Sequence, residues 1–183
     1  MLITLIWLSL LVLPQEKAPP LYLSPHIPAI SMEASDLALS KQKGQLFFSG
    51  NLFSGYLLEK YPDGATKSRV AYFNGKKESW EQRWFPGGML QSERLYEKGN
   101  KAGIHIGFWE NGTKQYEYHF KEGRYHGPFL EWYANGETMT QFFYEDGEEK
   151  GTQRSWNSDG SSKANFVTKN GRRYGLIGVK RCQ

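Results

Sequence analysis

Residues 120–136 read FKEGRYHGPFLEWYANG, and the spacing of three glycines in this stretch decides the fold. Gly123, Gly136 and Gly127 each belong to a column that recurs every 24 residues along the chain. The first column is Gly75, Gly99, Gly123, Gly147 and Gly171; the second is Gly64, Gly88, Gly112, Gly136 and Gly160; the third is Gly55, Ser79, Gly103, Gly127, Gly151 and Gly175. A fixed period of this length is typical of a solenoid or extended repeat array.

The residues that precede the first two glycine columns indicate what kind of unit repeats. Asn-Gly and Asp-Gly pairs supply the positive φ angles that two-residue hairpin turns require. The pairs are Asn74-Gly75, Asn111-Gly112, Asn135-Gly136, Asn170-Gly171, Asp63-Gly64, Asp146-Gly147 and Asp159-Gly160. Between them lie aromatic-rich runs of strand length, such as residues 129–133 and 139–144. The sequence therefore predicts an all-β protein, an elongated antiparallel meander of 24-residue hairpins in a single-layer twisted sheet.

Aromatic residues follow the same period. One column is Trp84, Phe108, Trp132 and Trp156, and another is Phe48, Tyr72, Tyr96, Phe120 and Tyr144. Cross-strand aromatic contacts contribute roughly 0.2–1 kcal/mol each to sheet stability. Because both faces of the predicted sheet carry aromatic residues, the sequence leaves open which face is buried. We expect Trp84, Phe108, Trp132 and Trp156 to be candidate partner-binding residues.

A two-residue turn at every first-column glycine also predicts the strand register. It places a ring opposite the third-column glycine in three repeats, with Arg94 opposite Gly103 and Val70 opposite Ser79 as departures. The three pairs are Phe142 with Gly151, Tyr118 with Gly127, and Phe166 with Gly175. A ring over a glycine shields exposed backbone, so this register would give the third column a packing role.

The N-terminal residues 1–15 read as a signal peptide. Their apolar run of 13 residues is shorter than the about 20 residues that a transmembrane helix needs. We expect export to the periplasm or the exterior, with an uncleaved membrane anchor as the alternative. Cys182 is the single cysteine, so no internal disulfide can form. It reads as an incidental thiol near the end of the sequence.

The remaining chain divides by composition into three parts. Residues 16–43 are a proline-rich linker and lead-in, in which residues 29–43 form either a short helix or the approach to the first strand. Residues 44–175 are the repeat array, with a degenerate capping unit at 44–55 and five repeats at 56–175. Residues 176–183 are expected to form a closing strand and tail.

Four repeat units resemble a known repeat type. They read YFNGKKESWEQRWFPGG, YEKGNKAGIHIGFWENG, FKEGRYHGPFLEWYANG and YEDGEEKGTQRSWNSDG, beginning at residues 72, 96, 120 and 144. This pattern of an aromatic-x-x-Gly turn, a basic or polar pair, a glycine and a second turn is similar to the MORN-variant repeat of YwqK-type antitoxins. The resemblance covers residues 44–175 and implies neutralisation of a toxin by direct protein binding.

The sequence carries no sign of catalytic chemistry. It has no GxSxG motif, P-loop or dinucleotide fingerprint, because its glycines follow the structural period. The histidines lack metal-ligand spacing and read as surface residues: His26, His105, His119 and His126. We expect no enzyme activity, no metal and no cofactor.

Charge leaves several binding functions open. The net charge of +4 comes from 23 basic and 19 acidic residues without blocks of one sign, which argues against nucleic-acid binding. The first hypothesis is a protein-binding scaffold whose partner is a toxin-like or envelope protein. The second is binding to a glycan or an anionic lipid surface, and the third is a structural envelope component. Basic residues at predicted turns would serve the second: Lys76, Lys77, Lys101, Lys114, Lys121, Arg124, Arg172 and Arg173.

Overall fold

The computed structural model describes residues 23–178 and confirms the all-β prediction. These residues contain no helix, and 63% of the structure is strand. No helix in this part of the chain is therefore available to cross a membrane. The predicted signal peptide at residues 1–15 and Cys182 both lie outside the described residues.

Sixteen strands are present among the described residues. They are β1 (Ser31–Glu33), β2 (Leu39–Gln42), β3 (Gln45–Phe48), β4 (Asn51–Leu52), β5 (Gly55–Lys60), β6 (Thr66–Phe73), β7 (Lys76–Trp84), β8 (Leu90–Glu97), β9 (Asn100–Phe108), β10 (Lys114–Lys121), β11 (Arg124–Trp132), β12 (Thr138–Glu145), β13 (Glu148–Glu149), β14 (Gly151–Trp156), β15 (Ser162–Lys169) and β16 (Arg172–Leu176).

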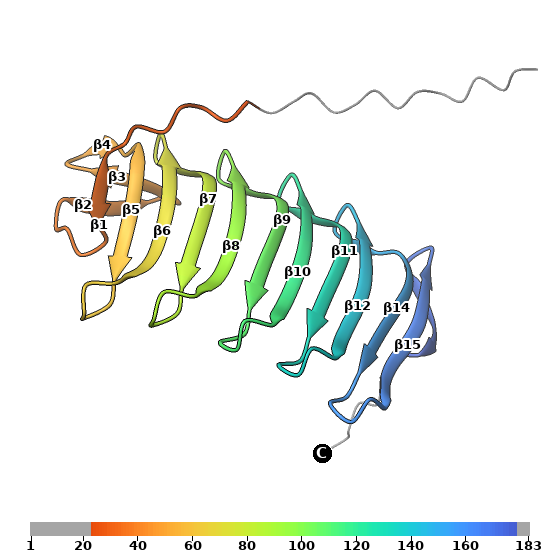
Figure 1. Ribbon diagram of the computed structural model, residues 1–183. Coiled ribbons are helices and arrows are strands. Elements are labelled where there is room, and N and C mark those ends of the chain that lie inside the picture. The colour runs from red at the N-terminus through yellow and green to blue at the C-terminus, as the bar shows by residue number, and fades with distance from the viewer. Residues whose placement is uncertain (1–22, 179–183) are drawn as a thin grey trace, which may run out of the picture.

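The main sheet is a long meander in which consecutive strands are neighbours (Figure 1). From β5 to β16 every pairing is antiparallel, as the repeat pattern predicts. The short strand β13 pairs with β12 beside the main path. At the N-terminal end β1 adds to β5 in parallel, so the lead-in at residues 29–43 forms strands instead of a helix.

A small second sheet closes the N-terminal end of the array. Strands β2, β3 and β4 form it, so this cap begins before Gly44, where the sequence placed its start. Its residues Leu46 and Phe53 pack against Val70 and Tyr72 of the main sheet, and these four form the buried hydrophobic cluster. The cap thus supplies apolar cover that a single-layer sheet lacks. Pro25 and Pro28 precede it outside any strand, as expected.

The two-residue turns of the first glycine column are confirmed. Phe73 pairs with Lys76 across Asn74 and Gly75, whose φ angles are 47° and 74°. Both turn residues have positive φ in all five of these turns, which is the requirement of a type I′ hairpin. Lys98 and Glu122 adopt this conformation as well, so the hairpin forms even where Asn or Asp is absent.

The second glycine column does not form two-residue turns, and that prediction is wrong. Tyr61 and Ala65 are joined by a hydrogen bond of 2.8 Å, which leaves three residues in the loop. Gly64 has a φ of 86°, but Asp63 does not have positive φ. Instead, the Asp63 carboxylate accepts a hydrogen bond from the N–H of Ala65 at 2.9 Å. An Asp-Gly pair suits this three-residue turn equally well, since only its last position must be left-handed.

The third column marks β-bulges, and this corrects the predicted register in two repeats. Tyr118 pairs with Phe129 and not with Gly127, because the register shifts between Tyr118 and Phe120. Gly151 pairs with Thr168 on β15 and has no ring within 4 Å of a Cβ built on it. The bulge residue is left-handed in each case, with a φ of 109° at Gly127 and 67° at Gly151.

The departures from the third column follow the same rule. Ser79 is left-handed with a φ of 63°, and the register shifts beside it so that Val70 pairs with Glu81. Gly103 is left-handed with a φ of 57°, and a shift between Glu93 and Leu95 means that Arg94 does not pair with it as predicted. In β16 there is no bulge, and Phe166 does lie opposite Gly175 as predicted. A ring over glycine also occurs where the sequence gave no expectation. A Cβ on Gly107 would lie 2.1 Å from the ring of Tyr116, which covers this backbone directly.

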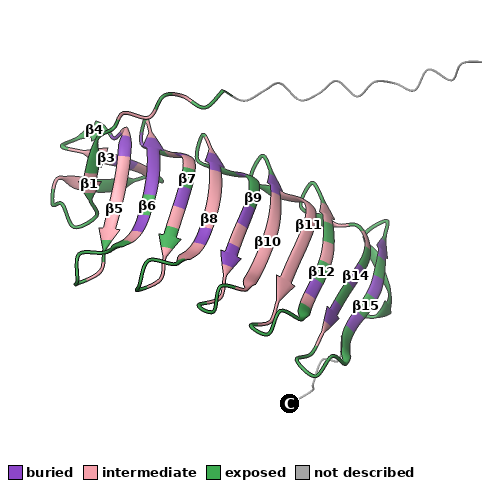
Figure 2. Ribbon diagram, in the orientation of Figure 1, coloured by how far each residue is buried: buried purple, intermediate pink, exposed green. Residues whose placement is uncertain are grey.

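The two faces of the sheet differ in burial. The ladder face carries Tyr118, Phe129, Phe142 and Phe166, and the opposite face carries Trp80, Ile104, Phe143 and Val167, which are exposed. We call the second the stripe face. Buried positions recur in most strands of the array, though not in β11 or β16, while most turn residues on both rims are exposed (Figure 2). The structure thus answers the question of burial that the sequence left open.

Replacement of two glycines by alanine should separate backbone strain from steric overlap. At Gly151 the added Cβ meets open space, so only the left-handed φ of 67° is strained. At Gly75 the Cβ would also lie 2.9 Å from the carbonyl oxygen of Leu46 in the cap. We expect Gly151→Ala to lower the free energy of unfolding by about 1 kcal/mol and Gly75→Ala by at least about 2 kcal/mol.

Denaturant unfolding followed by tryptophan fluorescence measures both losses. Gly151→Asn is the control, because asparagine tolerates the left-handed region and should lose less stability than Gly151→Ala. Equal losses for Gly75→Ala and Gly151→Ala would show that the cap does not pack on the first hairpin turn as described.

Candidate functional site

The predicted partner-binding aromatics lie in one row, at the ends of four strands. Trp84, Phe108, Trp132 and Trp156 terminate β7, β9, β11 and β14, and all four are half-buried. The register shifts at or opposite each of them, because each adjoins the three-residue turn. The row is regular, but its rings are partly covered by neighbouring side chains. The ammonium of Lys114, for example, lies 5.2 Å from the ring centroid of Trp132.

The backbone of this row is tied to the preceding repeat. The carbonyl oxygens of Trp84 and Trp156 accept hydrogen bonds of 2.9 Å from the hydroxyls of Tyr61 and Tyr133. The indole N–H of Trp109 donates to the carbonyl oxygen of Trp132, also at 2.9 Å. Each bond spans 23 residues, so the row connects successive repeats. The tryptophan row therefore contributes to the architecture as well as to the surface.

A more exposed apolar row lies on the stripe face, which the sequence interpretation missed as a site. We define the apolar stripe as Trp80, Leu95, Ile104, Pro128, Phe143 and Val167. Cross-strand pairing places Trp80 beside Leu95 and Pro128 beside Phe143. Trp80, Ile104, Phe143 and Val167 are 41–45% exposed. The signal was present in the 24-residue period, since Trp80, Ile104 and Pro128 recur at that spacing.

The ladder face contains a continuous run of ring contacts. Tyr118 stacks on Tyr116 at a centroid distance of 4.6 Å and on Phe129 at 4.2 Å. The run continues through Phe142 to Phe166 at 6.2 and 6.1 Å. Rings in contact across neighbouring strands stabilise a sheet that has no second layer.

A groove of about 470 Å³ lies on the ladder face near the C-terminal strands. Phe129, Phe142 and Phe166 line it together with Glu131 and Glu149. Its acidic groups already have partners within the protein. Glu131 accepts a hydrogen bond of 2.6 Å from the Tyr118 hydroxyl, which with burial holds the pKa of that tyrosine above its ordinary value.

The second carboxylate of this groove is also paired. Arg173 donates two hydrogen bonds to Glu149, at 2.8 and 2.9 Å, and its guanidinium lies 5.1 Å from the ring centroid of Phe166. Both carboxylates of the groove are therefore satisfied internally, while the polar residues Lys163, Thr140 and Ser155 also line it.

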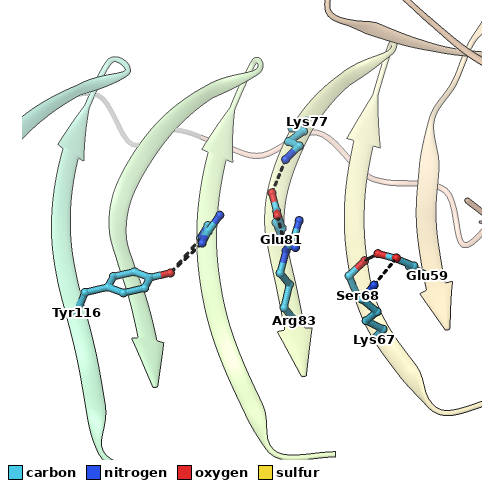
Figure 3. Close-up of polar contacts among 8 residues, drawn as sticks. Glu59, Lys67, Ser68, Lys77, Glu81, Arg83 and Tyr116 are labelled. Carbon is cyan, nitrogen blue, oxygen red and sulfur yellow. Dashed lines mark hydrogen bonds and ion pairs between the residues drawn. The ribbon is translucent and has the colours of Figure 1, made fainter. Parts of the chain in front are cut away.

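A carboxylate on the ladder face, that of Glu81, pairs with two cations of its own strand β7 (Figure 3). Glu81 is 1% exposed and pairs with Lys77 and with Arg83, the latter at 3.1 Å. Burial raises the pKa of this carboxyl, but the hydrogen bonds and charges of Lys77 and Arg83 outweigh burial and hold the pKa below its ordinary value. In the next repeat Arg94 donates to the hydroxyl of Tyr116 at 3.1 Å. The charged groups of Glu81 and Arg94 are thus held in ion pairs and hydrogen bonds within the sheet.

Two buried polar side chains donate hydrogen bonds to backbone carbonyls next to bulges. The ring of His105 donates from Nε2 to the carbonyl oxygen of Leu95 at 2.8 Å, and the amide of Gln153 donates to that of Phe143 at 3.0 Å. Gln153 lies 48 residues, or two repeats, after His105, so the same position performs the same task. A bulge removes a ladder hydrogen bond, and these side chains replace it.

The histidine prediction is therefore partly wrong. His105 was expected at the surface, but it is 2% exposed and packs between Tyr96 and Phe120. His126 is half-buried and contacts the carboxylate of Asp146 at 3.2 Å. Across residues 23–178, no group of three or more His, Cys, Asp or Glu side chains could hold a metal ion.

The comparisons with known proteins add no functional information. No protein-family model and no curated protein matches this chain in sequence. Among solved structures, the crystal structure of TarM is similar over 60% of this chain, with 13% identity and a TM-score of 0.33. The matched part spans 21% of TarM. Similarity at this level transfers neither activity nor partners.

The protein should become less stable as the pH decreases, because His105 is buried in its neutral form. Burial lowers the pKa of this histidine to about 4, against an ordinary value of 6.5. The unfolded chain therefore binds a proton between these pH values that the folded chain excludes. The stabilisation is complete above pH 6.5 and is lost as the pH falls toward 4.

Thermal unfolding between pH 7.5 and 4 measures this effect. His105→Gln keeps a donor for the Leu95 carbonyl, as Gln153 provides in a later repeat. We expect this variant to fold. The number of protons that the chain takes up on unfolding at a pH between 4 and 6.5 should be lower than in the unmodified protein, by at most about one. His126→Gln is the matched control at a half-buried position of a later repeat. An unchanged pH dependence in His105→Gln would contradict a buried neutral imidazole.

Proposed function

We propose that this protein is a non-enzymatic scaffold that binds another protein through the apolar stripe. The observation that carries the proposal is the stripe itself, which runs across several repeats at 41–45% exposure of its largest side chains. The stripe forms two apolar segments, Trp80 to Ile104 and Pro128 to Phe143, separated by His119, and Thr152 lies between Phe143 and Val167. Scattered single apolar residues are normal on a protein surface, whereas apolar residues that gather on one face favour an interaction site. Trp80 lies within this row, and tryptophan is enriched among the residues that contribute most to protein binding.

The polar residues beside the stripe support a protein partner. Gln82 donates to Glu93 at 2.7 Å on this face. Lys114 and His119 contact the two oxygens of Glu117 at 2.7 and 2.9 Å. Because these carboxylates are already paired, a partner that covers them does not leave an unpaired charge away from water. The partner chemistry that fits is an apolar protein surface with a polar rim.

The other binding functions have less support. The rim of two-residue turns carries Lys76 and Arg124, but Glu145, Asp146 and Glu148 interrupt the basic residues along it. A mixed rim is a poor match for an anionic lipid surface. The groove on the ladder face has its carboxylates paired internally, which gives a glycan few free hydrogen-bonding groups. A purely structural role would leave the exposure of the stripe without a purpose.

The identity of the partner is a prediction that follows from the resemblance to MORN-variant repeats. That resemblance favours a toxin-like protein, and the apolar N-terminal residues 1–15 favour a partner outside the cytoplasm. A repeat fold alone does not specify a function, so the stripe is the part of the proposal open to direct test.

Affinity capture with matched variants tests the proposal. The immobilised full chain is incubated with envelope and secreted fractions, and bound proteins are identified by mass spectrometry. The double variant Ile104→Asp/Phe143→Asp places charge in the stripe and should weaken capture of a stoichiometric partner by at least about tenfold. The control Leu37→Asp/Met89→Asp makes the same change at exposed apolar residues outside the stripe and should bind normally.

Two results would count against this function. Capture that is equal in both double variants would show that the stripe is not the contact, and absence of any stoichiometric partner would contradict a protein-binding scaffold. Alanine at Trp84, Trp132 and Trp156 tests the tryptophan row separately. Because that row is half-buried, circular dichroism must first show that the triple variant is folded.

A further inference from the structure

The two edges of the main sheet differ in how far other parts of the chain pack against them. At the N-terminal end, β1 pairs with β5 and the β2–β4 cap packs against the same end (Figure 1). At the other end, β16 is the last strand of the described residues, and all five of its residues are exposed. An edge strand presents unpaired N–H and C=O groups that can pair with another strand.

Among residues 23–178 no strand pairs with the outer side of β16, and this side corresponds to a position that is occupied in earlier repeats. The turn glycine of each following repeat donates its N–H to a carbonyl near the start of such a strand. Gly99 donates to Lys77 at 2.8 Å, and Gly123 donates to Lys101 at 2.9 Å. By the 24-residue period, the equivalent carbonyl in β16 is that of Arg173. The edge of β16 therefore has the form of an internal repeat boundary.

The register with β15 indicates which backbone groups point outward. Lys169 and Arg172 close the two-residue turn, and opposite residues alternate between hydrogen-bonded and non-hydrogen-bonded pairs. The pair of Thr168 with Arg173 is thus of the second kind, as is that of Phe166 with Gly175. The main-chain groups of Arg173 and Gly175 consequently face away from β15.

We propose that β16 pairs with β16 of a second copy of this chain, antiparallel and centred on Tyr174, so that two arrays join into one continuous sheet. In this register Arg173 of one copy lies opposite Gly175 of the other, and these are the residues whose main-chain groups face outward. Arg172 lies opposite Leu176, and Tyr174 lies opposite its own counterpart. All five residues of the strand are used.

Symmetry favours a closed pair of arrays. At the N-terminal end the edge strand β1 has three residues, against five in β16, so it offers β16 of another copy a shorter edge. Contact between two identical C-terminal edges has twofold symmetry and closes after two copies. A head-to-head pair is therefore the self-association that uses the longer edge of both copies.

Charge and exposure favour the register centred on Tyr174. A register centred on Arg173 would set two arginines directly opposite each other, which is unfavourable. In the proposed register Arg173 keeps its two hydrogen bonds to Glu149, at 2.8 and 2.9 Å. Tyr174 and Leu176 are 56% and 46% exposed, so pairing would bury apolar surface that is otherwise open. The inference is independent of the partner that the stripe binds.

Sedimentation velocity on the purified full chain tests the association. We expect a species of twice the 21.1 kDa chain mass that increases with protein concentration. Tyr174→Lys places two like charges opposite each other at the dyad and should weaken dimerisation by at least about tenfold. Ile104→Lys makes the same change in the apolar stripe and should leave dimerisation intact, which distinguishes edge pairing from stacking of faces.

Disulfide trapping tests the register. In a Cys182→Ser background, Tyr174→Cys should form a covalent dimer under mild oxidation, because opposite residues in a non-hydrogen-bonded antiparallel pair lie about 4.5 Å apart at Cα. Arg172→Cys is the matched control and should remain monomeric, since two copies of residue 172 do not face each other. A chain that stays monomeric at all concentrations, or a dimer insensitive to Tyr174→Lys without the residue-174 crosslink, would overturn the proposal.

Discussion

The architecture depends on one repeated hydrogen bond between successive repeats. Gly75, Gly99, Gly123 and Gly147 each donate a turn N–H to a carbonyl of the preceding repeat, at 2.8–2.9 Å. This bond requires a two-residue turn in which both residues have positive φ, and it fixes where the next strand begins. Because these four units dock on their predecessors in the same way, stability accumulates along the array as a sum of neighbouring contacts.

The bulges explain why polar side chains are buried in a thin sheet. Each bulge leaves a backbone group without its ladder partner, and side chains such as His105 and Gln153 replace that partner. Buried polar residues in a cleft often indicate catalysis, but here their hydrogen bonds go to the local backbone. Glu81 is similarly satisfied by Lys77 and Arg83. These three buried polar side chains thus have their hydrogen-bond partners within the sheet.

The two faces of this single-layer sheet differ in how well their apolar side chains are covered. On the ladder face, rings such as Tyr118 and Phe129 cover one another and the backbone between them, which substitutes for a second layer. On the stripe face, Ile104 and Phe143 have no such cover within the described residues and stay exposed. The ladder packs the rings of neighbouring strands together, and we propose that the stripe and the edge of β16 serve association. This division is what makes a repetitive sheet useful as a scaffold.

The sequence by itself determined the period, the strands, the antiparallel order and the type I′ turns, because Gly at fixed spacing and pairs such as Asn74-Gly75 act locally on φ. Only the tertiary structure decided the bulges, the three-residue turns and the exposure of each face. Tyr118 lies opposite Phe129 instead of Gly127 because β11 contains a bulge, in which more residues of one strand face fewer of its neighbour. The size of this register shift depends on how the two strands pair and not on the local preference of any residue. Exposure of Trp80 likewise depends on which neighbours cover it, a property of the assembled sheet.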